Sequence, residues 1–165
     1  MPPRSRSRSQ PRAGIQAVTF DVGGTLVTPH PSVGDLYARV AARHGRPGLD
    51  PATLEDRFRT TWKETPNFLH RRTDWESLVD AVFHGLVPRP PSTTFFADLY
   101  DEFAHAPAWR IYPDVLPTLE HLAGLGLDLG IVSNWDERLR PLLRELRLDR
   151  YFATIVISCE SGFPK

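Results

Sequence analysis

The chain has 165 residues, a length that suits one domain or one domain with a modest insertion. Hydrophobic residues make up 41% and charged residues 24%, which is typical of a soluble globular protein with a buried core. Lys and Arg number 20 and Asp and Glu also number 20, so no net charge attracts the chain to nucleic acid or to an anionic membrane. No apolar run is long enough to cross a bilayer. We therefore expect neither a nucleic-acid-binding protein nor a membrane protein.

The N-terminal segment is basic, low in complexity and poor in apolar side chains. Such a segment cannot bury enough surface to offset the entropy of ordering it, so residues 1–14 are predicted to form a disordered tail. It lacks the apolar core of a secretory signal, although Arg- and Ser-rich leaders occur in organelle transit peptides. The single cysteine, Cys159, fits a reducing compartment. We predict a cytoplasmic protein, with organelle import as the alternative.

A short apolar run, rich in residues that favour β-structure, leads directly into Asp21 and then breaks at Gly23-Gly24. Runs of this length that end in glycine predict a buried strand, here over residues 15–21. A carboxylate at the C-terminal end of such a strand lies where open α/β sheets bind ligands. Asp and Gly are also common turn residues, so this stretch alone leaves an ordinary polar turn equally open.

Four amphipathic helices in succession are predicted between residues 32 and 105. Their starting signals are Ser32, the pair Asp50-Pro51, a position near Thr73, and Ser92. No strand pattern interrupts them, so they are expected to form a helical unit inserted after the first strand. We interpret the aromatic stripes on these helices as the core of that unit rather than as a cofactor site.

Strands and helices alternate over the rest of the chain, which predicts a parallel, doubly wound α/β sheet. The predicted elements are a helix over 113–125, a strand over 127–133, a helix over 137–148 and a strand over 153–158. The strand at 15–21 should pair with the strand at 127–133, which should pair in turn with the strand at 153–158. The α/β core would then comprise residues 15–31 and 106–165, and the helical cap residues 32–105.

Because the carboxyl ends of parallel strands meet at one edge of a sheet, Asp21, Ser133-Asn134 and Lys165 are expected to form one site. Asp21 could attack a phosphoryl centre, while Ser133 and backbone amides near Gly23-Gly24 could donate to its oxygens. Lys165 could neutralise the developing charge as a compact ammonium group. Taken alone, Ser133-Asn134 is better explained as a polar helix cap; the combination in this order is what indicates a site.

Three stretches of the chain resemble the motifs of the haloacid-dehalogenase-like hydrolases. The segment from Phe20 to Leu26, Phe-Asp-Val-Gly-Gly-Thr-Leu, is similar to the first motif, and Ile-Val-Ser-Asn, ending at Asn134, is similar to the second. Lys165, preceded by Gly-Phe-Pro, is similar to the third. The four-helix insertion is similar to the family's C1-type cap. The resemblance covers about residues 15–165 and implies a Rossmann-like fold whose sheet is partial.

The resemblance also implies a chemistry. In this family the first Asp forms a covalent intermediate and binds Mg²⁺, together with the carbonyl two residues on and an acidic residue of a fourth motif. It thus implies that Asp21 is nucleophile and metal ligand, that Gly23 supplies a carbonyl ligand, that Ser133 with Asn134 forms the phosphate-binding motif, and that Lys165 is the charge clamp. The implied function is phosphatase-type hydrolysis of a small phosphorylated metabolite through an aspartyl-phosphate intermediate.

Two departures from the family's pattern bear on activity. Phosphatases of the family carry an acid/base Asp two residues after the nucleophile, where this chain has Gly23, and the loss of such a group typically costs about 10²–10⁴-fold in rate. The acidic fourth motif would follow Lys165, so we expect a truncated chain that is inactive by itself. The missing strands would also leave Ile15–Phe20 as a sheet edge open to a pairing partner.

Two functional classes remain open on the sequence. The first is a Mg²⁺-dependent hydrolase of small phosphorylated metabolites, active only when the missing part is supplied. The second is a non-catalytic binding or regulatory module, in which Gly23 marks the lost acid/base group. Within the first class, phosphonoacetaldehyde-cleaving relatives also lack the second Asp and use a cap lysine; Lys63 is the candidate, although a solvated helix lysine is the favoured interpretation.

Overall fold

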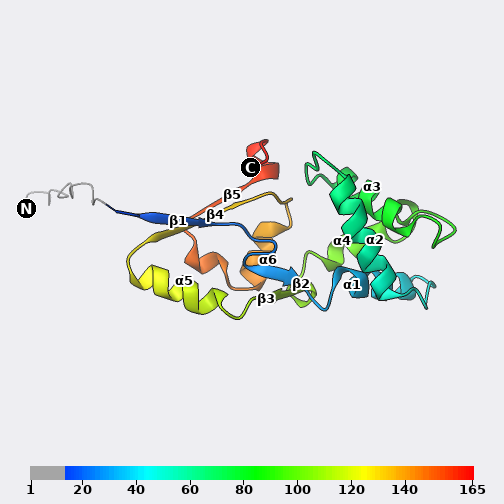
Figure 1. Cartoon of the computed structure of the whole chain (residues 1–165), viewed down its shortest axis with the longest axis horizontal. Coiled ribbons are helices and arrows are strands. Elements are labelled where there is room, and N and C mark those ends of the chain that lie inside the picture. Colours follow the sequence, from blue (N-terminus) through cyan, green and yellow to red (C-terminus); the bar gives the residue numbers. More distant parts are fainter. Residues whose placement is uncertain (1–13) are drawn as a thin grey trace, which may run out of the picture.

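A computed structural model describes residues 14–165, so the predicted disordered tail lies, except for Gly14, outside the described residues. The fold is α/β, as predicted, with a parallel sheet next to a group of helices (Figure 1). The strands are β1 (Ala17–Phe20), β2 (Val27–Pro29), β3 (Trp109–Ile111), β4 (Asp128–Ser133) and β5 (Thr154–Ile157). The α-helices are α1 (Val33–Arg43), α2 (Pro51–Glu64), α3 (Arg72–Phe83), α4 (Phe96–Glu102), α5 (Val115–Gly124), α6 (Leu139–Glu145) and α7 (Ser158–Ser161).

The main sheet has the strand order β1-β4-β5, and both pairings are parallel. The predicted order of the three strands is therefore confirmed. The register places Phe20 opposite Ile131 and Ser133 opposite Ile157, so the three strands end at the same edge. Strand β1 is an edge strand of the described sheet, since it pairs with β4 on one side. Ile15, just before β1, is 77% exposed.

A second, two-stranded sheet was not expected from the sequence. Strands β2 and β3 pair antiparallel, with Val27 opposite Ile111, and form a ribbon that lies between the main sheet and the helices α1–α4 (Figure 1). Each strand has three residues, too few for the alternation that marks a strand in a sequence. The ribbon brings together the two points at which the chain leaves the core and returns to it.

Helices α1 and α2 begin where the sequence predicts. The Ser32 hydroxyl accepts a hydrogen bond from the Asp35 N–H at 3.0 Å, and the Asp50 carboxylate accepts one from the Thr53 N–H at 3.0 Å. The fourth helix starts at Phe96 rather than at Ser92, which is a correction. Residues 91–93 instead form a 3₁₀ turn, and Thr94, with φ −133° and ψ −78°, separates that turn from α4.

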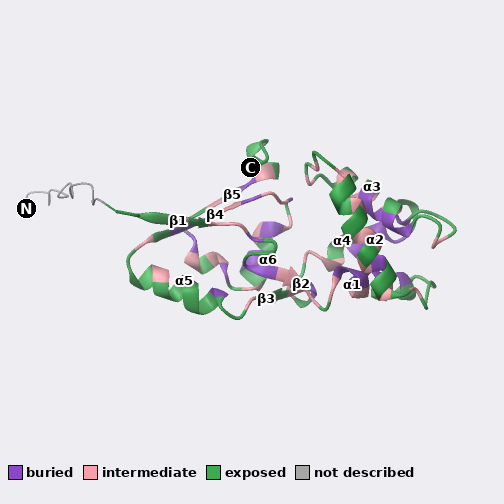
Figure 2. Ribbon diagram, in the orientation of Figure 1, coloured by how far each residue is buried: buried purple, intermediate pink, exposed green. Residues whose placement is uncertain are grey.

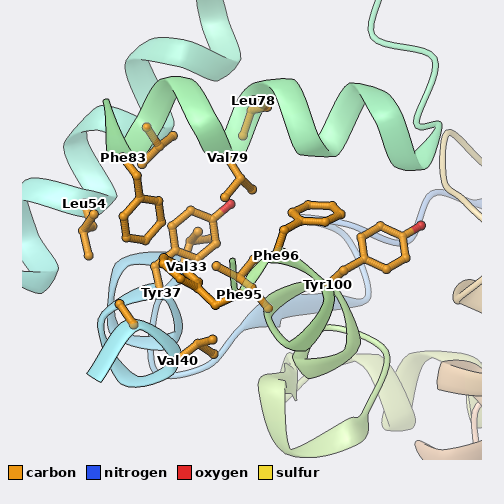
Figure 3. Close-up of a cluster of buried hydrophobic side chains, with 13 residues drawn as sticks. Val33, Tyr37, Val40, Leu54, Leu78, Val79, Phe83, Phe95, Phe96 and Tyr100 are labelled. Carbon is orange, nitrogen blue, oxygen red and sulfur yellow. The ribbon is translucent and has the colours of Figure 1, made fainter. Parts of the chain in front are cut away.

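Buried side chains form two separate clusters, one in each part of the molecule (Figure 2). The cluster of the helical unit, which we define as residues 33–103, is aromatic: the rings of Tyr37 and Phe83 stack with centroids 5.6 Å apart, and Leu54 and Val40 pack around them (Figure 3). The cluster of the α/β core is mostly aliphatic, with Phe152 as its buried ring, and includes Leu119, Ile131, Leu139, Leu143 and Ile157. Each part therefore has a core of its own.

Helices α1 and α2 approach each other most closely at Gly34. A Cβ atom at this position would lie 2.0 Å from the carbonyl oxygen of Pro51 and 2.8 Å from the backbone nitrogen of Glu55. The backbone N–H of Gly34 also donates to the Glu55 carboxylate at 2.9 Å. Only glycine fits this contact without a shift of backbone, so Gly34 sets the spacing of the two helices.

Candidate active site

The Asp21 carboxylate lies at the end of β1, where three donors converge on it. Its Oδ1 accepts hydrogen bonds from the Ser133 hydroxyl at 2.8 Å and from the Val22 N–H at 2.7 Å. Its Oδ2 lies 2.7 Å from the Lys165 Nζ. The parallel pairing of β1 with β4 explains the contact with Ser133, because it places the two strand ends side by side. The structure thus brings together three of the residues that the sequence predicts for the site.

Asn134, the fourth predicted residue, contacts Lys165 rather than Asp21. Its side-chain Oδ1 accepts a hydrogen bond from the Lys165 backbone N–H at 2.8 Å, and the Lys165 Nζ also lies 3.4 Å from the Val132 carbonyl oxygen. Two groups at the end of β4 therefore hold the lysine against the carboxylate. We name Asp21, Ser133 and Lys165 together the polar floor.

The electrostatics of the polar floor keep Asp21 ionised. Partial burial raises the pKa of Asp21, but the hydrogen bonds from Lys165, Ser133 and Val22 and the positive charge of Lys165 outweigh it. The net result is a pKa below the ordinary value of an aspartate. A carboxylate that stays deprotonated at neutral pH can act as a nucleophile or as a metal ligand.

Gly23 and Gly24 form the turn that follows Asp21. Gly24 adopts a left-handed conformation with φ +74°, which favours glycine, and its N–H donates to the Val27 carbonyl at 2.9 Å. Within residues 14–165 no hydrogen bond reaches the carbonyl of Gly23. The Asp21 carboxylate and the Gly23 carbonyl are hard oxygen donors of the kind that Mg²⁺ prefers, so these two residues fit the metal that the resemblance implies. In the same described range there is no group of three His, Cys, Asp or Glu side chains that could hold a metal.

A cavity of about 500 Å³ opens above the polar floor, between the edge of the sheet and the helical unit. All four tryptophans of the chain line it. We use the name aromatic wall for six of the lining side chains, which are Phe58, Trp62, Trp75, Tyr100, Trp109 and Trp135. The aromatic stripes of the helices, interpreted from the sequence as core alone, thus also face the cavity; Trp62 is 38% exposed. Lys63 is exposed on α2 and is not part of the lining.

Trp135 stands over Gly23. A Cβ atom added to Gly23 would lie 3.2 Å from Cζ3 of the Trp135 ring, closer than side-chain atoms normally approach. The Trp135 ring also contacts the Trp109 ring, with centroids 5.2 Å apart. A side chain at position 23 would therefore press against this ring, so the lack of a side chain at Gly23 and the position of the Trp135 ring go together.

An ion pair between Asp136 and Arg138 joins the two halves of the molecule. Asp136 is fully buried, and it accepts hydrogen bonds from Arg138 at 2.6 and 2.8 Å and from the indole N–H of Trp75 at 2.9 Å. Arg138 donates in turn to the Tyr100 carbonyl at 2.7 Å, and its guanidinium lies 3.6 Å from the centre of the Tyr100 ring. Trp75 and Tyr100 belong to the helical unit, so these contacts tie it to the loop that follows β4.

The sequence interpretation missed this ion pair, although a signal was present. Asp136 and Arg138 come directly after Ser133-Asn134, at the edge where the site was expected. The sequence could not show that Trp75 is the hydrogen-bond partner of Asp136, because the two residues are 61 positions apart in the chain.

His70 is the histidine that lines the cavity, from the loop between α2 and α3. Its backbone is left-handed, with φ +59°, and its ring packs against Phe68 and Trp75 at centroid distances of 4.9 and 5.9 Å. Burial lowers the pKa of His70 below its usual value, although the charge of Asp136 acts in the opposite direction. The imidazole is therefore held neutral at pH 7.

Comparisons with known proteins identify the family of the chain. A family model for haloacid dehalogenase-like hydrolases matches residues 15–165. The fold is α/β, with a helical unit between β2 and β3. The chain belongs to the haloacid dehalogenase-like hydrolase family.

Two relatives illustrate the range of that likeness. The human haloacid dehalogenase-like hydrolase domain-containing protein 3 is 30% identical over 93% of this chain and 65% of its own length. Phosphoglycolate phosphatase 1 of Pseudomonas aeruginosa is 32% identical over 84% of this chain and 49% of its own length. The chain spans about two thirds of the length of the curated relatives that it matches over most of its sequence, for example 66% of the Xenopus laevis protein.

Solved structures share the fold. The HAD-hydrolase YfnB from Bacillus subtilis, crystallised with magnesium, has a TM-score of 0.69 at 18% identity, over 92% of this chain and 67% of its own. L-2-haloacid dehalogenase from Xanthobacter autotrophicus has a TM-score of 0.63 at 24% identity, over 92% of this chain and 60% of its own.

Within the described residues, no helix combines the length and the apolar character that a membrane span requires.

Proposed function

We propose that this protein is a phosphatase-type hydrolase that acts on a small phosphorylated metabolite through an aspartyl-phosphate intermediate. The observation that carries the proposal is the convergence of Ser133 and Lys165 on the Asp21 carboxylate, at 2.8 and 2.7 Å. A nucleophilic carboxylate with a hydroxyl donor and a cation beside it is the minimum that phosphoryl transfer from an ester requires. The phosphatase name of one curated relative supports the same class.

Each residue of the polar floor has a separate role in the proposed reaction. An Asp21 oxygen forms a bond to phosphorus while the bond from phosphorus to the leaving oxygen breaks, and the electron pair departs with that oxygen. Ser133 donates to a phosphoryl oxygen, and Lys165 neutralises the charge that develops on the phosphoryl group. Asn134 positions Lys165 through its backbone N–H. Asp21 and Gly23 would hold Mg²⁺, which supplies further positive charge at the phosphoryl group.

We further propose that the 165-residue chain has little or no turnover by itself. Gly23 has no side chain to protonate the leaving group, and a positioned acid typically contributes about 10²–10⁴-fold. Among residues 14–165 the buried carboxylate is that of Asp136, and it is occupied by Arg138 and Trp75. It therefore offers no substitute for the missing acid.

The alternative is a binding or regulatory module that holds a phosphorylated ligand without cleaving it. The position of Trp135 favours this alternative specifically, because a Cβ atom at position 23 would lie 3.2 Å from its ring, so an acid/base side chain there would have to move the ring. In this case the polar floor would serve recognition alone.

The test restores the acid. Gly23→Asp combined with Trp135→Ala makes room for the carboxylate, and we expect it to raise Mg²⁺-dependent release of inorganic phosphate from glycerol 3-phosphate, whose alkoxide leaving group needs a proton, by about 10²-fold over Trp135→Ala alone. Asp21→Asn in the same background should abolish the gain, while circular dichroism shows an unchanged fold. No gain in rate, with inorganic phosphate still bound in calorimetry, would favour the binding module. If the unchanged chain does not bind phosphate at all, both functions are wrong.

A further inference from the structure

We infer that the ligand of this cavity carries a flat, uncharged aromatic group on its phosphoryl oxygen, as an aryl phosphate does, and that Trp135 is the residue that selects it. The inference rests on the proposed phosphoryl site but not on turnover, so it applies to the hydrolase and to the binding module alike. It separates this chain from enzymes whose substrates are small polar acids or sugar phosphates.

The shape and surface of the cavity support an aromatic occupant. The Trp62 and Trp75 rings stack with centroids 5.7 Å apart on the side of the helical unit, and the Trp109 and Trp135 rings lie 5.2 Å apart on the side of the core. Both pairs line one cavity of about 500 Å³, which is enough for a ring and a phosphoryl group. Aromatic faces attract other aromatic rings, preferably in offset-stacked or edge-to-face arrangements.

The charges in the cavity do not favour a second anionic group. Besides Lys165, which contacts Asp21, the lining within residues 14–165 contains one further permanent cation, Arg138. The guanidinium of Arg138 makes two hydrogen bonds to Asp136 and one to the Tyr100 carbonyl, so its charge is already compensated. A carboxylate on the ligand would lose its hydration and gain no free cation in return. The organic part of the ligand is therefore uncharged.

Trp135 is placed to contact that organic part directly. Its ring lies over Gly23, next to the carboxylate that faces the phosphoryl group, so the atom bonded to the phosphoryl oxygen comes closest to this ring. Its backbone is fixed, because its N–H donates to the Ser158 hydroxyl at 3.1 Å and its carbonyl accepts from the Cys159 N–H at 3.3 Å. Gly23 is the residue that allows the ring to occupy this place.

The test compares two non-hydrolysable anions with the same head group. Isothermal calorimetry on the full 165-residue chain in Mg²⁺ buffer measures the affinity for phenylphosphonate and for methylphosphonate. We expect phenylphosphonate to bind about tenfold tighter or more, since stacking one ring on an aromatic side chain is worth about that factor. Trp135→Leu should reduce this preference to about twofold or less, whereas Trp135→Phe, which keeps an aromatic face, should retain most of it. Thermal melts of both variants report whether the fold survives.

Gly23→Ala provides a second variant that leaves every aromatic residue in place. Its Cβ meets the Trp135 ring at 3.2 Å and should displace the ring, so the ratio of the phenylphosphonate affinity to the methylphosphonate affinity should fall, as it does for Trp135→Leu. Equal affinities of the unchanged chain for the two phosphonates would overturn the inference and leave the proposed function intact. Tighter binding of phosphonoacetate than of phenylphosphonate would overturn it as well. If no phosphonate binds, the phosphoryl site itself is wrong, and the inference falls with it.

Discussion

The polar floor and the aromatic wall of the cavity differ in what fixes the positions of their residues. Two side chains of the polar floor, Asp21 and Ser133, stand at the ends of neighbouring parallel strands, so the topology of the sheet fixes their positions. Lys165 follows α7 and is held beside them by contacts with Asn134 and the Val132 carbonyl. The aromatic wall is supplied largely by helices, through faces that also pack into a core (Figure 3). The floor is thus determined mainly by connectivity, whereas the wall depends on how two separately packed parts are held against each other.

The contrast places the weak point of the site at the junction of the two parts. Each part has its own buried cluster, so neither needs the other for its core. Among the residues that the structure describes, the buried contacts of Asp136 and Arg138 with Trp75 and Tyr100 cross this junction. Changes there should alter the wall and leave the floor intact, and the following predictions test that separation in order of expected effect.

The largest effect is expected from Asp136→Ala. The change leaves the guanidinium of Arg138, 11% exposed, without its anionic partner, and the loss of one member of a buried pair costs about 3–5 kcal/mol. Urea unfolding followed by circular dichroism measures the change in free energy of unfolding. Asp128→Ala, at an exposed position at the start of β4, is the matched control and should change it by less than about 0.5 kcal/mol. Similar losses for both variants would contradict the junction described above.

Trp75→Phe should cost about 1.5–3 kcal/mol, the typical worth of a hydrogen bond to a charged group, because the indole N–H that donates to Asp136 at 2.9 Å is lost while a ring remains. The same change should loosen the junction, which hydrogen exchange at the amides of α3 would detect. Trp62→Phe is the control, since no hydrogen bond of the Trp62 indole is seen in the described part of the chain. If Trp62→Phe is as costly as Trp75→Phe, ring size rather than the hydrogen bond decides the stability.

Gly34→Ala should destabilise the helical unit by about 1–3 kcal/mol, because the new Cβ would lie 2.0 Å from the Pro51 carbonyl oxygen and would force α1 and α2 apart. The control is Gly124→Ala at the end of α5, where no atom lies within 4 Å of the added Cβ. That control should be neutral or slightly stabilising. Thermal unfolding of the two variants measures the difference, and equal melting temperatures would show that the helices can separate without cost.

The smallest effect concerns pH. Burial lowers the pKa of His70, so below about pH 6.5 the unfolded chain binds a proton that the folded chain resists. The contribution of His70 to stability is thus complete above pH 6.5 and is lost as the pH falls from there toward the folded-state pKa. His70→Gln removes this dependence, so the unchanged chain should lose more stability than the variant between pH 8 and pH 5.5. Identical pH profiles of unfolding would contradict a neutral His70.

The sequence was sufficient for the polar floor but not for the aromatic wall. A strand that ends in Asp21 and another that ends in Ser133 need only be neighbours and parallel for their side chains to meet, and both conditions follow from alternating strands and helices. For Trp62 and Trp75 no comparable rule predicts that their side chains line a cavity. Their spacing shows which helix face is apolar, but a face that fills a core and a face that lines a cavity have the same periodicity.

The same limit explains the other misses. The β2–β3 ribbon is formed by strands of three residues each, which are too short to show a period. The start of α4 at Phe96 depends on the backbone angles of Thr94, which propensities do not determine. The position of Asp136 and Arg138 next to Ser133-Asn134 was a signal, but their role depends on Trp75 and Tyr100, which are distant in the chain.

The location of every tryptophan around one cavity has a consequence for spectroscopy. Excitation at the red edge of the protein absorption band selects indoles, and here all four report from the same place. At ring separations of 5.2 and 5.7 Å, excitation energy transfers readily between the two tryptophans of each pair. The emission therefore reports on the surroundings of the cavity rather than on a single tryptophan. Fluorescence of this chain is therefore a local probe of the gap between two bodies, while far-ultraviolet dichroism averages over both. A melt in which the emission changes at a lower temperature than the dichroism would show that the gap opens first.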